Sequence, residues 1–176
     1  MEIICGIIGF VSLLLIIVVI IRNKFVFSMI KIDKAEEDID IYLEKKCELL
    51  KRTRPIIKKE LKLDEFLEDL NEFNSKEISN IKAHNILKGS YNELFKTLDD
   101  HEKLLKSDTL ISILEELNEN EEEIIGAIKF YNDTVVDYNK LIVSFPASIL
   151  AFIFRYKKKE FYNNEKREMF EILNDK

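Results

Sequence analysis

The stretch FYNDTVVDYNKLIVSFP, from Phe130 to Pro146, decides the fold of this chain. It contains the dipeptide Tyr-Asn twice, at Tyr131–Asn132 and again one heptad later at Tyr138–Asn139. Positions one heptad apart share a helical face, so the repeat predicts that both tyrosines meet the neighbouring helices in the same way. Phe145–Pro146 predicts the end of this helix, because proline lacks the N–H that a helix interior needs.

An apolar stripe, here called the seam, runs along the same helix at alternating steps of four and three. It follows the capping pair Ser107–Asp108, and only Glu121 breaks its apolar character. The seam consists of Leu110, Leu114, Leu117, Ile124, Ile128, Tyr131, Val135, Tyr138, Ile142 and Phe145. This spacing is typical of helices packed as in a coiled coil. Asn132 and Asn139 flank the seam, and we expect them to bond buried backbone or neighbouring groups and fix helix register.

Two helical regions precede the seam. A first apolar stripe, here called the first-helix stripe, follows steps of three and four and consists of Ile32, Ala35, Ile39, Leu43, Leu50 and Ile57. It predicts a first helix that continues straight out of the N-terminal segment, with Pro55 as a kink or an end. The second region is predicted from Asp64, an N-cap residue, to Leu105. Its stripe consists of Leu67, Leu70, Phe73, Ile78, Ile81, Tyr91, Leu94, Leu98 and Leu105. Gly89–Ser90 either lies inside one descending helix or reverses the chain.

The N-terminus contains an uncharged run from Ile3 to Ile21. At 1.5 Å per residue this run covers about 28 Å, close to the hydrocarbon thickness of a bilayer. It predicts a retained single-pass membrane anchor; a cleaved signal peptide is the alternative, although Glu2 is the only charged side chain before the run. Arg22 and Lys24 follow the span, so the positive-inside rule places the N-terminus outside the cell membrane and the C-terminal domain in the cytoplasm.

Composition agrees with long helices joined by short connections, since the chain has only four glycines and two prolines. We expect an all-α fold: a transmembrane helix that continues into an elongated antiparallel bundle of three long helices plus a short fourth. The predicted organisation is an anchor over 1–22, a bundle over 23–156 and a charged tail over 157–176. The net charge of −6 argues against nucleic-acid binding. Cys5 and Cys47 cannot pair, which fits a reducing compartment.

No set of residues predicts catalysis, a cofactor, a metal or a small-molecule substrate. The two histidines, His84 and His101, lack the glutamates that a di-iron bundle places three residues earlier. The acidic run Glu119–Glu123 predicts a solvated face, because carboxylates at consecutive helical positions point around the helix. We therefore expect a protein without enzymatic activity.

An aromatic and basic patch follows Pro146. It is formed by Phe152, Phe154, Arg155, Tyr156, Lys157, Lys158 and Lys159, after a short helix that Pro146 can open. This composition suits a lipid surface or an acidic partner, and it equally suits a short helix that caps the bundle. If 64–105 is one descending helix, the patch lies at the end of the bundle far from the membrane, which is our expectation.

These segments together resemble the LemA family of membrane-anchored helical proteins, found mostly in bacteria. The resemblance rests on the Tyr-Asn repeat, on Glu121 and Ile124, and on the run Ile39–Lys46, and it extends from Ala35 to Tyr162. Further matching positions downstream are Ile149, Ala151, Phe161 and Tyr162. The chain departs from the family pattern at Arg155, where a glycine is common. The family has no agreed biochemical activity, and some relatives are associated with internal membrane formation.

Three functions remain open from the sequence. The first is a membrane-tethered helical scaffold or interaction protein, with a protein partner or a second copy of the chain. The second is a membrane-organising protein that acts on lipid. The third is an accessory subunit for signalling or transport that transmits a change through the long first helix.

Overall fold

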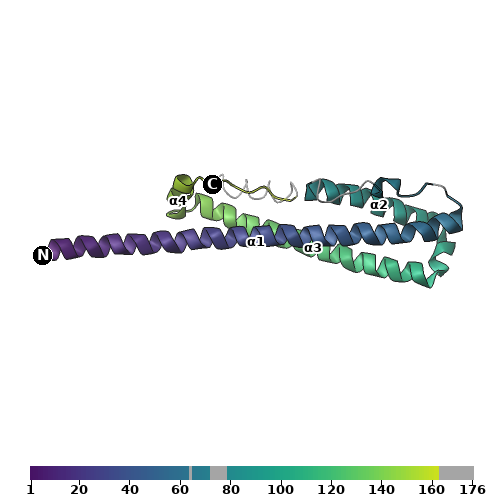
Figure 1. Cartoon of the computed structure of the whole chain (residues 1–176), viewed down its shortest axis with the longest axis horizontal. Helices are drawn as coiled ribbons and strands as arrows, with labels where there is room; N and C mark the ends of the chain where they lie inside the picture. The colour runs from purple at the N-terminus through teal and green to yellow at the C-terminus, as the bar shows by residue number, and fades with distance from the viewer. Residues whose placement is uncertain (64, 72–78, 163–176) are drawn as a thin grey trace. The chain divides into compact units, whose positions relative to one another are not determined.

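The computed structural model describes residues 1–63, 65–71 and 79–162 (Figure 1). These residues form four α-helices and two 3-10 turns and contain no strand, which confirms the all-α prediction. The helices are α1 (Glu2–Leu61), α2 (Asn80–Asp100), α3 (Asp108–Val143) and α4 (Ala147–Phe154). The 3-10 turns are η1 (Glu68–Leu70) and η3 (Glu102–Lys106). Asp64, Phe73 and Ile78, together with the charged tail beyond Tyr162, lie outside the described residues.

The chain divides into two compact units. The N-terminal unit comprises Met1–Ala35 and Phe130–Lys176, and the middle unit comprises Glu36–Lys129. Helices α1 and α3 each contribute residues to both units.

Helix α1 is continuous over 60 residues, from the apolar run into the bundle. Pro55 lies inside it on an exposed position, so the helix does not end there as one alternative had it. It ends at Leu61, where Lys62 adopts a left-handed conformation with φ 53° and the N–H of Leu63 bonds the carbonyl of Lys58. A left-handed residue after the last turn is the usual way in which a helix end bonds its final carbonyl groups.

The core of the middle unit is built from one face of each of its three helices. Fully buried side chains come from the first-helix stripe, from α2 and from the seam: Ile39, Leu43, Leu50, Ile57, Ala83, Leu87, Leu94, Leu110, Leu117 and Ile124. Helix α3 runs antiparallel to α1, since Glu116 pairs with Arg52 and, further along α3, Glu121 pairs with Lys46. Ser107 caps α3 by accepting a bond from the N–H of Leu110.

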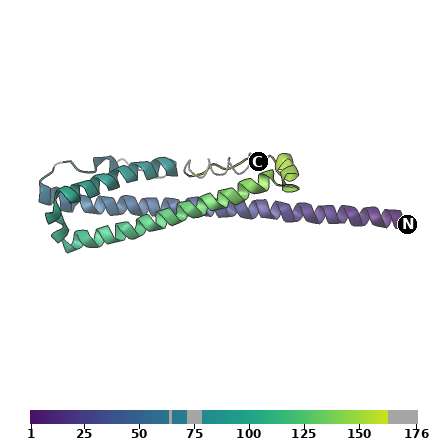
Figure 2. The same ribbon diagram turned by 180° about the vertical axis from the view of Figure 1, so that it is seen from behind.

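Helix α2 differs from the prediction in its start and its direction. It begins at Asn80 and passes through Gly89–Ser90 without interruption. Its first residue, Asn80, donates its side-chain N–H to the carbonyl of Glu36, whereas Asp99 and Asp100 share a pocket with Leu61. Helix α2 therefore runs parallel to α1, and both views show the two side by side (Figures 1 and 2).

The prediction of one descending helix over 64–105 is thus wrong, because α2 begins at Asn80 and runs parallel to α1. After α1 the chain turns back, and Arg54 of α1 bonds the segment 66–71. It donates to the carbonyl of Phe66, to Glu68 at 2.8 Å and to Asn71 at 2.6 Å. Lys58 bonds the same Glu68 carboxylate at 2.9 Å. These contacts keep the chain beside α1 as it turns back.

The core of the N-terminal unit combines α1 with the end of α3 and with α4. Its buried apolar side chains are Ile21, Phe25, Ile32, Ala35, Tyr131, Val135, Tyr138, Ala147, Leu150 and Ala151. Among seam positions, Ile128 and Ile142 are half-buried. Phe145 is 83% exposed because α3 ends at Val143, so its assignment to the seam is wrong.

Candidate functional site

The repeated asparagines of α3 hold an extended segment, residues 156–162, that follows α4. The amide nitrogen of Asn139 donates to the carbonyl of Lys159 at 2.9 Å, and the N–H of Lys159 donates to the amide oxygen of Asn139 at 2.9 Å. Asn139 is 2% exposed. One side-chain amide therefore satisfies both backbone groups of a residue, as a neighbouring strand does in a sheet.

Asn132 makes a related contact one heptad earlier on α3. Its amide oxygen accepts a bond from the N–H of Tyr162 at 2.8 Å, and the hydroxyl of Tyr131 donates to the carbonyl of Glu160 at 3.0 Å. Asn132 is also 2% exposed. Both asparagines thus bond backbone, although they bond an extended segment rather than a neighbouring helix.

The two tyrosines do not meet neighbouring helices in the same way, contrary to the prediction. Tyr138 packs edge-on against Phe25 of α1, with ring centroids 6.0 Å apart. Burial, with the nearby Tyr156, raises the pKa of its hydroxyl. Tyr131 instead packs edge-on against Tyr162, at 6.1 Å. The difference arises because the extended segment covers α3 at Tyr131, whereas α1 covers it at Tyr138.

Helix α4 lies beside α1 at the point where the apolar run ends. The guanidinium carbon of Arg22 is 5.9 Å from the ring centroid of Phe154, and the ring of Phe25 stacks on Tyr156 at 4.6 Å. The prediction that the aromatic and basic patch lies far from the anchor is therefore wrong. The reason is the direction of the helices: α2 runs parallel to α1 and α3 antiparallel to it, the reverse of the expected directions.

The members of the patch do not share one face. Phe152 and Phe154 are 86% and 45% exposed, and Arg155, Lys157 and Lys158 are exposed as well. Tyr156 is half-buried on Phe25, and Lys159 is half-buried beside Asn139. Arg155 ends α4 in a left-handed conformation with φ 56°, which glycine adopts at less cost than other residues.

A buried ion pair crosses the middle unit, and the sequence did not predict it. The side chain of Lys46 is fully buried and its ammonium bonds Glu121. The same ammonium lies 4.8 Å from the ring centroid of Tyr91, whose hydroxyl bonds Asn118 at 3.1 Å. Two gaps in the patterns could have revealed it: the first-helix stripe skips position 46, and Glu121 interrupts the seam.

Burial shifts the ionisation of the groups around this pair. Desolvation lowers the pKa of Lys46, although the Glu121 carboxylate opposes the shift. Burial and the charge of Lys46 lower the pKa of the half-buried His84. Among the described residues no group of histidine, cysteine, aspartate and glutamate side chains could hold a metal ion. His101 lies on the surface, where its ring bonds the carbonyl of Thr97 at 3.2 Å.

The N-terminal part of α1 is long and apolar enough to cross a membrane, and none of its apolar window is buried. Ile3 is 80% exposed, Ile21 is buried, and Arg22 and Lys24 are exposed at its end. A signal sequence near the N-terminus can also be long and apolar enough to meet these criteria. Helices α3 and α4 are long and apolar enough to cross a membrane only if they are taken together, and they are bent by 93° relative to each other.

Comparison with known proteins gives one match. The sequence profile of the LemA family matches residues 35–172. No curated protein and no solved structure matches the chain. The profile begins at the residue from which the resemblance was traced, Ala35, and covers most of the chain.

Proposed function

The chain belongs to the LemA family, and from that premise we propose that it is a membrane-anchored helical scaffold without enzymatic activity. In this proposal α1 crosses the cell membrane once, the N-terminus lies outside, and the bundle lies in the cytoplasm. A protein partner or a second copy of the chain binds the bundle.

One observation carries the proposal: a single unbroken helix contains both the unburied apolar run and the core stripe of the bundle. An unburied apolar run of this length is unfavourable in water and favourable in lipid. The basic residues Arg22, Lys24 and Lys31 follow the run, which supports a cytoplasmic bundle.

The buried polar groups support a structural role. Lys46 pairs with Glu121, and Asn132 and Asn139 bond the backbone of the extended segment. These side chains would be candidates for chemistry in a helical protein, yet each already bonds a group within the fold. A scaffold needs such bonds for a unique packing and needs no reactive group.

The test uses the full-length protein purified from membranes in mild detergent. We expect it to resist extraction by alkaline carbonate and to elute as a complex larger than the 20.8 kDa chain, with a partner protein or as an oligomer. A mature N-terminus beyond residue 21 would show that the run is a cleaved signal. A monodisperse monomer without any co-purifying protein would contradict the scaffold.

A second candidate is a function at the lipid surface. It is favoured by the position of α4, whose exposed Phe154 lies beside Arg22 at the end of the apolar run. An accessory role in signalling or transport rests on the continuity of α1 alone.

A further inference from the structure

The outer face of α4 and its flanks is apolar and exposed. The segment from Leu141 to Phe154 contains no charged residue. Within α4, Ala147, Leu150 and Ala151 are buried and fasten the helix to its unit. The exposed apolar side chains of the segment are Val143 (47%), Phe145 (83%), Ile149 (52%), Phe152 (86%), Ile153 (61%) and Phe154 (45%). A continuous apolar surface of this kind marks a site that meets lipid or another protein.

Three features of the N-terminal unit indicate which of these covers α4. The first is its level along α1: Phe154 lies against Arg22, the first charged residue after the apolar run. If α1 spans a bilayer, Arg22 lies at its surface, and α4 then lies at the same depth.

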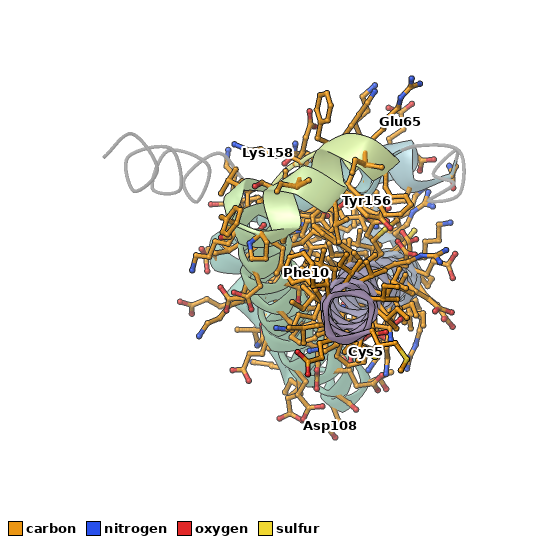
Figure 3. All side chains as sticks on the ribbon, turned by 90° about the vertical axis from the view of Figure 1, so that its left-hand side faces the viewer. Cys5, Phe10, Glu65, Asp108, Tyr156 and Lys158 are labelled. Atoms are coloured by element: carbon orange, nitrogen blue, oxygen red, sulfur yellow. The ribbon has the colours of Figure 1, made fainter. Side chains whose placement is uncertain are left out.

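The second feature is orientation. Helix α4 is bent by 93° from α3. Figure 3 looks from the N-terminal end, shows the start of α1 with Cys5 and Phe10 end-on, and shows the α4 ribbon across the view next to Tyr156. A helix that lies across the direction of the span lies along the plane of the membrane, which is the orientation of interfacial helices.

The third feature is charge. Exposed Arg155, Lys157 and Lys158 follow the apolar face directly, and exposed Arg22 and Lys24 lie at the same end of the unit. Basic residues at the level of the headgroups favour anionic lipids. Aromatic residues such as Phe154 and Tyr156 suit the boundary between headgroups and acyl chains.

We propose that α4 lies in the headgroup–acyl boundary of the leaflet from which its own α1 emerges. Phe145, Ile149, Phe152 and Ile153 enter the acyl chains, and Arg155, Lys157 and Lys158 contact anionic headgroups. The chain is thus held by one span and one interfacial helix in the same membrane. This inference rests on the proposed function in one respect, the retention of the span.

The chain contains no tryptophan, so single tryptophans report on depth without background. The variants Phe152→Trp (α4), Ile16→Trp (span) and Ile125→Trp (middle unit, 60% exposed) are made in the full-length protein. Each is reconstituted into vesicles of phosphatidylcholine and phosphatidylglycerol, with and without lipids brominated on the acyl chains. We expect bromine to quench Phe152→Trp and Ile16→Trp, and to leave Ile125→Trp unquenched with a water-like emission maximum.

The three positions separate the possible failures. Quenching of Ile16→Trp without quenching of Phe152→Trp would overturn the interfacial helix and leave the anchor in place. A blue-shifted but unquenched Phe152→Trp would show that another copy of the chain covers α4, and would equally overturn it. Absence of quenching at Ile16→Trp would show that the span itself is wrong.

The basic residues have their own test in the same vesicles. The triple variant Arg155→Gln/Lys157→Gln/Lys158→Gln is combined with Phe152→Trp. With Arg155, Lys157 and Lys158 intact, we expect bromine to quench Phe152→Trp more strongly in vesicles that contain phosphatidylglycerol than in vesicles of pure phosphatidylcholine. We expect the triple variant to lose this difference. An unchanged dependence on phosphatidylglycerol would contradict the assignment of these residues to anionic headgroups.

Discussion

The ammonium of Lys46 and the carboxylate of Glu121 form an ion pair between α1 and α3, with the Lys46 side chain fully buried and Glu121 25% exposed. A buried charge is costly without its partner, whereas a well-packed apolar pair in its place is tolerated. We therefore expect the pair to specify the alignment of the two helices more than it adds stability.

Removal of one partner tests this. We expect Glu121→Ala to lower the free energy of unfolding by roughly 3 kcal/mol, and Lys46→Met/Glu121→Leu to recover most of the loss. Urea unfolding of the 22–176 fragment in mild detergent measures both. The exposed pair Arg52–Glu116 is the control: Glu116→Ala should cost at most about 1 kcal/mol. Equal losses for the two single variants would contradict the buried pair.

The docking of residues 156–162 depends on Asn139. Asn139→Ala removes both bonds to Lys159, and we expect it to cost about 2 kcal/mol and to speed cleavage by trypsin in the segment containing Lys157 and Lys158. Limited proteolysis with mass spectrometry measures the rate at these sites. Ser144→Ala is the control, since the Ser144 hydroxyl bonds only the local carbonyl of Lys140 among the described contacts. Unchanged cleavage in Asn139→Ala would show that other contacts hold the segment.

The register of the seam is tested by two positions that lie two residues apart on α3. Val135 is fully buried and Asp133 is exposed. We expect Val135→Asp to destabilise the 22–176 fragment by roughly 3 kcal/mol or more, because it buries a carboxylate, and Asp133→Ala to change stability by less than about 0.5 kcal/mol. Equal melting temperatures for the two variants would contradict this register.

We expect the contacts that hold residues 66–71 beside α1 to weaken in acid. Bonds from Lys58 and then Arg54 lower the pKa of Glu68 from 4.5 to about 2. A carboxyl with a lowered folded pKa stabilises the fold above its unfolded pKa, and this stabilisation disappears as the pH falls from 4.5 towards 2. We expect Glu68→Gln to melt earlier than the unaltered chain at pH 7 and together with it at pH 2. High salt should shrink the difference at pH 7, because Glu68 is 39% exposed.

Topology is tested by thiol labelling at a surface position. Cys47 is unsuitable, since it is 5% exposed and burial raises the pKa of its thiol. We expect Lys59→Cys, in a chain with Cys5→Ser and Cys47→Ser, to react with an impermeant maleimide only after lysis. Glu2→Cys should react in intact cells. Labelling of Lys59→Cys in intact cells would reverse the orientation.

The sequence predicted which face of each helix is buried better than it predicted which element packs against that face. Periodicity reports which side of a helix is buried, so most of the seam and the first-helix stripe were predictable. It does not report the element that covers this side, and Tyr131 and Tyr138 therefore differ in their contacts. An extended segment bound through its backbone, such as that at Lys159, leaves no periodic signal at all.

The sequence predicted the wrong direction for α2, and this misplaced the aromatic and basic patch. Charged residues that bond across a turn, as Arg54 does with Glu68, have no fixed sequence spacing and resemble a solvated helix face. A single descending helix over 64–105 implies the wrong direction for every later element. The placement of α4 beside Arg22 could therefore not be predicted from α4's own residues.

The described bonds that join Asn139 to Lys159 and Asn132 to Tyr162 are made to main-chain atoms of Lys159 and Tyr162. The side chains at exposed positions of this segment, such as Lys157 and Glu160, are consequently not required for docking. Mutation can change their charge and size while the segment keeps its place on α3. Descendants of this chain could thereby acquire different preferences for what lies next to α4 without first having to evolve a new fold.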